Sequence, residues 1–255
     1  MINNIKVVIL AGGYGTRLGS LTKIKPKPMV DVCNKPIIEH IMKLYLKYDF
    51  NNFIICTGYK GDVIKNYFKN KYKKFVVQET KKNLLVSKKN LIIRVVDTGK
   101  NSLTGGRIRR IKKFVNKDDF FHLTYGDGLS NVNIKKLTSF HKKSKKMATV
   151  TAVKIQVPQE RFGVVYFKNK NIVKSFVEKP DIKKIFINGG FFVLKRNIFK
   201  FIKNDFTRWE AKPMETIAKI KQLSAFKHTG FWKCMDTPRD REYLEKYKNK
   251  KIPWI

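Results

Sequence analysis

A short apolar run near the start of the chain breaks into a glycine-rich turn, and two basic residues follow it. Residues 7–29 read VVILAGGYGTRLGSLTKIKPKPM. Glycines lack Cβ atoms, so the backbone can turn sharply after a strand and bring several N–H groups against an anionic oxygen. Arg17 and Lys27 can add positive charge to the same anion. The pattern predicts a strand that ends at a phosphate-binding turn, whose glycines are Gly12, Gly13 and Gly15.

Two better-known glycine motifs do not fit this segment. A P-loop requires G-x-x-x-x-G-K-[ST], but Arg17 stands five positions after Gly12 and no Gly-Lys pair follows. A dinucleotide-binding fingerprint requires G-x-G-x-x-G, and Leu18 stands where the third glycine belongs. A plain strand-to-loop turn is the simpler alternative, and the basic pair after the turn argues against it.

The chain is strongly basic, with 56 Lys and Arg against 19 Asp and Glu and a net charge of +37. Such a charge by itself suggests a nucleic-acid-binding protein. The lysines are spread along the chain, however, and no zinc-finger, aromatic RNA-binding or basic-zipper pattern accompanies them. We therefore expect a solvated lysine-rich surface and no nucleic-acid partner. The same charge would attract nucleotides and sugar phosphates.

Cysteine and histidine chemistry has little support in the sequence. The residues of these two types are isolated, with no C-x-x-C pair and no histidine placed to complete a zinc site. We expect reduced, structural thiols and no Ser–His–Asp or Cys–His catalytic unit. The residues are Cys33, Cys56, Cys234, His40, His122, His141 and His228.

Length and composition indicate one folded unit. A chain of 255 residues with 42% hydrophobic content can bury one substantial core, so we expect a single domain over residues 1–255. No run approaches the length of a transmembrane helix, and the start MINNIKVVIL lacks a signal-peptide pattern. We therefore expect a cytoplasmic protein with no membrane partner.

Short apolar runs alternate with amphipathic stretches, which predicts an α/β protein with a largely parallel sheet. The expected strands are Lys6–Leu10, Phe53–Thr57, Leu91–Val96, Phe120–Thr124 and Ala148–Val153. The expected helices are Pro36–Tyr48, Asp62–Phe68, Gly106–Val115, Ile134–Lys142, Pro213–Ile220 and Pro238–Tyr247. After Val157 the pattern becomes richer in strands, at Gly163–Phe167, Ile172–Val177 and Ile187–Leu194. We expect this second half to extend the same sheet.

An acidic residue is expected at the same edge of the sheet as the glycine turn. In open α/β sheets, ligands bind beyond the carboxyl ends of the strands. The turn over residues 10–17 falls there, and so does Asp127, which follows the expected strand Phe120–Thr124 and lies between two glycines. A simple Asp-Gly turn is the structural alternative. Magnesium prefers carboxylate and phosphate oxygens, so Asp127 is a candidate metal ligand.

The motif LAGGYGTRL followed by PKPM resembles the signature of the sugar-1-phosphate nucleotidylyltransferases. Further segments resemble the glucose-1-phosphate cytidylyltransferase branch of that family, and the resemblance runs from Ile5 to Trp254. They are FIICTGYKGDVIKNYF, VVDTGKNSLTGGRIRRI, TYGDG, RFGVV, VEKP, INGGFFVL and GFWKCMDTPRDREYLE. The resemblance implies a Rossmann-like three-layer α/β/α fold with a mixed, mostly parallel central sheet. It also implies a nucleotide-binding half at about residues 1–130, a sugar-phosphate-binding half at about 131–255, and a homo-oligomer.

The same resemblance implies a reaction and roles for individual residues. Glucose 1-phosphate and CTP would give CDP-glucose and pyrophosphate with Mg²⁺ as cofactor, and the product would feed deoxysugar and surface polysaccharide synthesis. Asp127 and Asp236 match the family's metal ligands, and Arg17 and Lys27 match the catalytic cations that bind the β- and γ-phosphates. The implied nucleotide-binding residues are Leu10, Ala11, Gly12, Gly13, Gly15, Thr16, Arg17, Lys27, Ser102, Thr104, Gly105, Arg107 and Gly126. The implied sugar-phosphate-binding residues are Glu178, Lys179, Asn188, Gly189 and Gly190.

Several alternatives stay open at the level of sequence. A related enzyme could use UTP or dTTP, because a pyrimidine read by backbone groups leaves few side chains to inspect. A non-catalytic relative could bind nucleotide sugars, although both aspartates and both family lysines are present. Residues 18–21 lack the proline that many nucleotidylyltransferases carry there, as the cytidylyltransferase branch also does. The lysine-rich segment Lys81–Asn90 falls where the family inserts a loop with subunit or nucleotide contacts, so the oligomeric state stays open.

Overall fold

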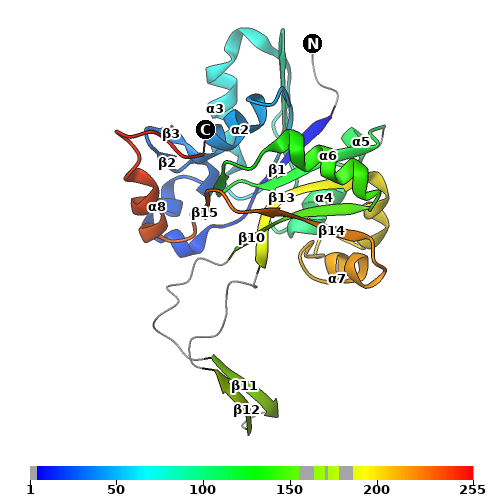
Figure 1. Cartoon of the computed structure of the whole chain (residues 1–255). Coiled ribbons are helices and arrows are strands. Elements are labelled where there is room, and N and C mark those ends of the chain that lie inside the picture. Colours follow the sequence, from blue (N-terminus) through cyan, green and yellow to red (C-terminus); the bar gives the residue numbers. More distant parts are fainter. Residues whose placement is uncertain (1–4, 116, 155–163, 170–171, 178–185, 255) are drawn as a thin grey trace.

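The computed structural model describes residues 5–115, 117–154, 164–169, 172–177 and 186–254. Its centre is a nine-stranded sheet with the strand order β14-β10-β13-β8-β1-β4-β7-β6-β5. Figure 1 labels β1, β10, β13 and β14 of this sheet. Three two-stranded sheets accompany it, β2–β3, β9–β15 and β11–β12. The strands of the large sheet are β1 (Lys6–Ala11), β4 (Asn52–Thr57), β5 (Val76–Glu79), β6 (Leu84–Lys88), β7 (Leu91–Asp97), β8 (Phe120–Tyr125), β10 (Ala148–Lys154), β13 (Phe186–Lys195) and β14 (Leu223–His228). The shorter pairs are β2 (Asp31–Val32), β3 (Lys35–Pro36), β9 (Gly128–Ser130), β15 (Trp232–Cys234), β11 (Val164–Asn169) and β12 (Ile172–Val177).

The large sheet is mixed and mostly parallel. β1 pairs in parallel with β4 and β8, β4 with β7, and β10 with β14. Only β13 and β6 run against the direction of the other strands of this sheet. Because β10, β13 and β14 belong to it, the second half of the chain extends the sheet of the first half, as predicted.

Helices cover both faces of the sheet, because its central strands are apolar on both sides. Val7 and Ile9 of β1 pack into one buried cluster with residues of α2, α3, α6 and α8, and Val8 and Leu10 pack into a second with residues of α4, α5 and α7. Burying each such side chain contributes about 1.5–3 kcal/mol. This arrangement confirms the predicted three-layer fold. The helices are α1 (Ser20–Ile24), α2 (Ile37–Leu46), α3 (Gly61–Lys71), α4 (Thr104–Arg110), α5 (Lys112–Val115), α6 (Ile134–Ser144), α7 (Lys212–Lys219) and α8 (Pro238–Glu245).

The predicted elements are largely present, and two regions differ. The stretch Gly106–Val115, expected as one helix, is divided into α4 and α5 at Ile111, whose φ of −97° and ψ of 5° leave the helical region. Ile111 and Val115 both lie in the same buried cluster. The lysine-rich segment Lys81–Asn90 contains β6, in which Leu84 and Val86 are buried on either side of the half-buried Leu85.

No helix in the described part of the chain combines the length and the apolar composition that crossing a membrane requires.

Candidate functional site

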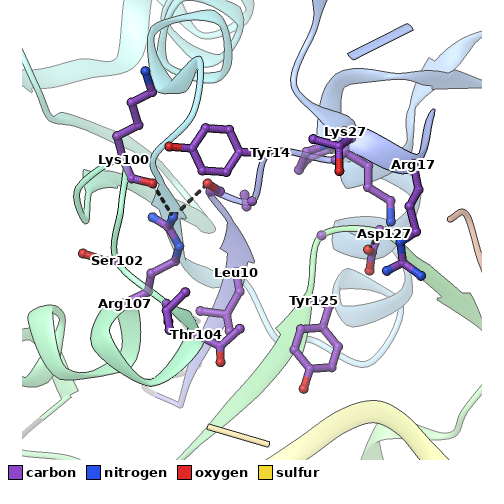
Figure 2. Close-up of a pocket in the computed structure, with 18 of the residues that line it drawn as sticks. Leu10, Tyr14, Arg17, Lys27, Lys100, Ser102, Thr104, Arg107, Tyr125 and Asp127 are labelled. Atoms are coloured by element: carbon purple, nitrogen blue, oxygen red, sulfur yellow. Dashed lines mark hydrogen bonds and ion pairs between the residues drawn. The ribbon is translucent and has the colours of Figure 1, made fainter. Parts of the chain in front are cut away.

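A pocket of about 410 Å³ opens at the carboxyl ends of β1 and β8, where the sequence placed the phosphate-binding turn (Figure 2). Its walls come from the glycine turn after β1, the segment around Lys27, the loop between β7 and α4, and the end of β8. The predicted residues that line it are Leu10, Ala11, Gly12, Gly13, Gly15, Thr16, Arg17, Lys27, Ser102, Thr104, Arg107, Gly126, Asp127 and Asp236. The fold therefore brings the nucleotide and metal candidates together in one cavity.

The other predicted residues lie elsewhere. Gly105 is buried behind the pocket wall, where an added Cβ would lie 2.7 Å from the Thr207 carbonyl oxygen. Gly190 has φ +83°, and a Cβ there would lie 2.7 Å from the ring of Tyr125, a residue of the pocket wall. Its N–H donates to the side-chain oxygen of Asn188 at 2.9 Å, so this part of β13 adjoins the pocket without lining it.

Gly189 lies in the same strand, and its carbonyl accepts a hydrogen bond from the Trp232 indole at 2.8 Å. Glu178 and Lys179 lie outside the described residues.

Arg107 closes one end of the pocket from beneath the glycine turn. Its guanidinium donates to the carbonyl oxygens of Gly12, Thr57 and Gly99 at 2.8 to 2.9 Å. The Thr57 carbonyl ends β4, and those of Gly12 and Gly99 come just after β1 and β7, so one side chain connects the ends of three neighbouring strands. Figure 2 shows its hydrogen bonds to Gly12 and to the Lys100 carbonyl.

Close packing around Arg107 explains why glycine stands at two positions. A Cβ at Gly12 would lie 2.2 Å from Arg107 Nη1, and one at Gly58 would lie 2.4 Å from the same atom. The arginine is only 4% exposed, and burial lowers the pKa of its guanidinium below the ordinary value. Hydrogen bonds to neutral carbonyls compensate for the water that the charge has lost.

Four charged groups meet at the opposite end of the pocket. The Lys27 ammonium lies 2.6 Å from Asp127 Oδ2 and 2.6 Å from Asp236 Oδ1. Arg17 lies at the mouth, with its guanidinium 3.3 Å from Asp236. Burial by itself would lower the pKa of Lys27, but the Asp127 charge and the hydrogen bonds to both carboxylates outweigh it and raise the pKa above its ordinary value. The ammonium group therefore stays charged at neutral pH.

A short antiparallel strand pair brings the two aspartates together. Asp127 lies between β8 and β9, and Asp236 stands two positions after the last residue of β15. β9 and β15 pair with each other, and the Met235 N–H donates to the Asp127 carbonyl at 2.9 Å. This pairing explains how two acids far apart in the sequence come to share one site.

The side chains at this end suit a hard divalent cation. Carboxylate oxygens of Asp127 and Asp236 and the Cys234 sulfur all lie within 4.8 Å of one another. Burial and the nearby carboxylates raise the pKa of the Cys234 thiol, so it stays protonated and is a poor ligand. Two carboxylates are the donors that Mg²⁺ takes from a protein while phosphates and waters complete its shell.

Glu210 supports the pocket wall, a role that the sequence motifs did not reveal. Its carboxylate accepts hydrogen bonds from the Tyr125 hydroxyl and the Thr104 hydroxyl, each at 2.6 Å. Thr104 Oγ1 also accepts from the Trp209 N–H at 2.9 Å. Burial and the Glu210 carboxylate raise the pKa of Tyr125, which therefore remains a hydrogen-bond donor. Glu210 thus links the end of β8 to the start of α4 across the pocket wall.

Other lining residues that sequence reasoning missed are less strongly connected. Tyr14 extends from the glycine turn, and its hydroxyl donates to the Asn101 side chain at 2.9 Å. The ring of Tyr14 also lies 5.1 Å from that of Tyr59. The position of Tyr14 inside the turn motif was the sequence signal that could have identified it, although many strand-to-helix turns carry an aromatic residue without binding a ligand.

Known proteins share both the sequence and the fold of this chain. Residues 6–237 match the nucleotidyl transferase family. The chain is 45% identical over 257 residues to glucose-1-phosphate cytidylyltransferase of Salmonella typhimurium, with 98% of each chain covered. It is 30% identical to the catalytic subunit beta of mannose-1-phosphate guanylyltransferase of Xenopus tropicalis, covering 98% of this chain and 68% of that protein.

A solved structure extends the likeness to the fold. The inositol-1-phosphate CTP transferase from T. maritima superimposes with a TM-score of 0.67 at 16% identity, covering 99% of each chain. Its low identity supports the fold alone. The sequence matches cover the glycine turn, Lys27 and both aspartates of the pocket. The chain therefore belongs to the nucleotidyl transferase family and is a homologue of the glucose-1-phosphate cytidylyltransferases.

Proposed function

We propose that this enzyme transfers CMP from CTP to α-D-glucose 1-phosphate, giving CDP-glucose and pyrophosphate. The observation that carries the proposal is the convergence of Lys27, Asp127 and Asp236 on the cavity that the glycine turn also lines. The name of the Salmonella relative supports glucose 1-phosphate and CTP as the substrates.

The reaction needs charge compensation more than proton transfer. A sugar phosphate oxygen attacks the α-phosphorus in line, and pyrophosphate departs from the opposite side. The attacking phosphate is already ionised at neutral pH, so positioning and electrostatic stabilisation can supply the rate enhancement without a general base. Consistent with this, no histidine is among the described residues that line the pocket.

The basic residues of the pocket have complementary tasks. Backbone N–H groups of the glycine turn would hold the triphosphate, and Arg17 and Lys27 would bind its β- and γ-phosphates. These two cations would also stabilise the charge that accumulates on departing pyrophosphate. Glu178 and Lys179 would bind the sugar hydroxyls and the sugar phosphate, with Asn188 and the glycines beside it.

Asp127 and Asp236 would hold a magnesium ion, which would neutralise phosphate charge and bring the two anionic substrates within reach of each other. The two carboxylates also orient the Lys27 ammonium toward the phosphate end of the pocket. The opposite end would receive the base, where Ser102, Thr104 and backbone groups of the glycine turn are exposed to the cavity. Like its family, the enzyme would act as a homo-oligomer, which light scattering can measure.

The test is pyrophosphate release from glucose 1-phosphate and magnesium, with CTP, UTP, dTTP, GTP and ATP offered separately and controls without sugar. Release with CTP alone is the expected result. Release with UTP or dTTP would retain the mechanism and change the base specificity. Silence with all five nucleotides from a folded sample would contradict the proposed reaction and favour another sugar phosphate or a non-catalytic role.

A further inference from the structure

Lys27 occupies a position between two carboxylates that would otherwise repel each other. Its ammonium lies 2.6 Å from an oxygen of Asp127 and 2.6 Å from an oxygen of Asp236. The lysine side chain is 12% exposed, and those of the two aspartates are 23% and 31% exposed. Because all three are partly shielded from water, the two ion pairs are stronger than surface pairs.

The ammonium group and a divalent cation require the same two carboxylates. Oδ2 of Asp127 and Oδ1 of Asp236 contact Lys27, and these carboxylates are also the hard donors available for a metal at this end of the pocket. Arg17 cannot fully replace the lysine, since it reaches only Asp236, at 3.3 Å, and its side chain is 73% exposed.

The backbone of Lys27 is fixed, whereas its side chain can pivot. Lys27 begins a 3-10 turn between Pro26 and Pro28, and the Val30 N–H donates to the Lys27 carbonyl at 3.1 Å. Gly15 packs against the base of the side chain, where an added Cβ would lie 3.1 Å from Lys27 Cβ. Beyond Cβ, the flexible lysine stem can carry the ammonium from the carboxylates toward a phosphate in the same cavity without moving the chain.

We propose that Lys27 acts as a tethered cation that competes with free divalent metal for Asp127 and Asp236, and that the triphosphate relieves this competition by drawing the ammonium group to its own oxygens. The inference rests on the proposed function, because it takes these two aspartates as the metal ligands. It makes the metal centre weak before the nucleotide binds and strong afterwards. Metal and nucleotide would then enter the site together, and magnesium alone would not occupy it.

The test measures Mn²⁺ binding without nucleotide or sugar, using the electron paramagnetic resonance signal of free Mn²⁺. Lys27→Met removes the charge and keeps much of the side-chain volume, and it should bind Mn²⁺ at least about tenfold more tightly than the unaltered enzyme, within the usual range for coupled sites. Lys27→Gln, whose amide can still donate to a carboxylate, should show a gain in the same direction and serves if the methionine variant does not fold.

Lys25→Met is the matched control, because it removes the same charge from the same segment. Lys25 is half exposed and pairs with Asp31 at 3.0 Å. It should leave Mn²⁺ affinity unchanged. An equal gain in Lys25→Met would mean that net charge alone sets the affinity, and it would overturn the proposal.

A double variant separates this inference from the proposed function. Lys27→Met combined with Asp127→Asn should lose the gain, because one of the two contested ligands is gone. If Asp127→Asn alone weakens Mn²⁺ binding but Lys27→Met does not strengthen it, the metal site stands and the competition is refuted. If Asp127→Asn leaves Mn²⁺ binding unchanged, the metal assignment itself fails, and the inference fails with it.

Discussion

Two buried or half-buried cations stand at opposite ends of the same pocket, and their partners differ in kind. Lys27 contacts two carboxylates, and Arg107 contacts backbone carbonyls from three strand ends. A carboxylate can exchange an ammonium group for Mg²⁺, which takes carboxylates rather than backbone carbonyls as its usual protein ligands. We therefore propose that the Lys27 end, which we call the phosphate end, rearranges during catalysis, and that the Arg107 end, which we call the base end, stays fixed.

The difference also follows from the two side chains. The planar guanidinium offers five N–H donors in a fixed fork, so it can satisfy several carbonyls at once in a space too small for a Cβ at Gly12 or Gly58. The lysine carries a point charge on a flexible stem. Changes at the phosphate end should therefore lower turnover, and changes at the base end should lower stability and nucleotide affinity.

The largest expected effect is at the phosphate end. Asp127→Asn removes one hard-oxygen ligand and one partner of Lys27, and it should lower turnover by about a hundredfold or more at saturating magnesium. Its midpoint of urea unfolding should stay close to that of the unaltered enzyme. Asp49→Asn, at an exposed acid that pairs with Lys135, is the control and should keep full activity. Near-normal turnover of Asp127→Asn would remove this residue from the reaction.

Arg107→Lys should reverse that pattern, because it keeps the charge and loses the fork of donors. Leaving buried carbonyls without donors should lower the free energy of unfolding by about 2 kcal/mol, measured by urea denaturation, and should raise the KM for CTP more than it lowers kcat.

Gly58→Ala tests the same contact from the other side, since its methyl group would collide with the guanidinium. Arg109→Lys is the matched control, because Arg109 is half exposed and lies 3.6 Å from its partner Asp205. If turnover fell by a hundredfold while stability held in Arg107→Lys, the two ends of the pocket would not differ as described.

The positions of the glycine turn and of Lys27 in the pocket could be predicted from local sequence, whereas the pairing of the two aspartates beside Lys27 and much of the wall around Arg107 could not. Glycines after an apolar run, followed by Lys27 between two prolines, predict a turn at this position without any information from distant parts of the chain. Asp127 and Asp236 meet only because β9 pairs with β15, a three-residue contact that no periodicity reveals. Their pairing came from the family resemblance.

Two other features lay beyond sequence pattern for physical reasons. Glu210 lies in a loop without a motif, and its importance comes from two hydroxyl groups that the fold brings to it. Strand β6 is obscured because its two buried residues, Leu84 and Val86, stand among lysines that face solvent. Conversely, the central strands were predictable, since burial on both faces makes each of them a continuous apolar run.

A smaller effect is expected from Glu210, which fixes the wall of the base end. Glu210→Ala removes the acceptor shared by Tyr125 and Thr104, and it should raise the KM for CTP by roughly tenfold with kcat changed about twofold or less, the cost of about one to two hydrogen bonds. Glu210→Gln should restore part of the affinity, because its amide oxygen can accept one of the two bonds.

Glu215→Ala, at an exposed acid of α7, controls for the loss of negative charge and should leave both constants unchanged. A fall in kcat with an unchanged KM in Glu210→Ala would place Glu210 with the phosphate end and break the distinction between the two.

The smallest effect concerns His122, a buried histidine that lies away from the pocket and is neutral. Its Nε2 lies 3.0 Å from Thr138 Oγ1, which donates its own hydrogen to the Ile134 carbonyl, so the imidazole must donate and the other ring nitrogen stays unprotonated. Burial, with a smaller contribution from His141, lowers the pKa of His122 to about 3.

Between about pH 6.5, where the unfolded chain takes up a proton, and pH 3, the unfolded state binds a proton that the folded state does not. Stability should therefore fall as the pH falls across this range, with a slope approaching about 1.4 kcal/mol per pH unit from this group.

His122→Gln keeps a donor toward Thr138 without a titrating group. Its urea-unfolding free energy should therefore depend less steeply on pH between 6 and 5, by about 1 kcal/mol over that unit. An unchanged slope would mean that His122 accepts a proton in the folded protein. The contrast between Lys27 and Arg107, whose charges are stabilised by hydrogen-bonding partners, and His122, which burial keeps neutral, would then no longer hold.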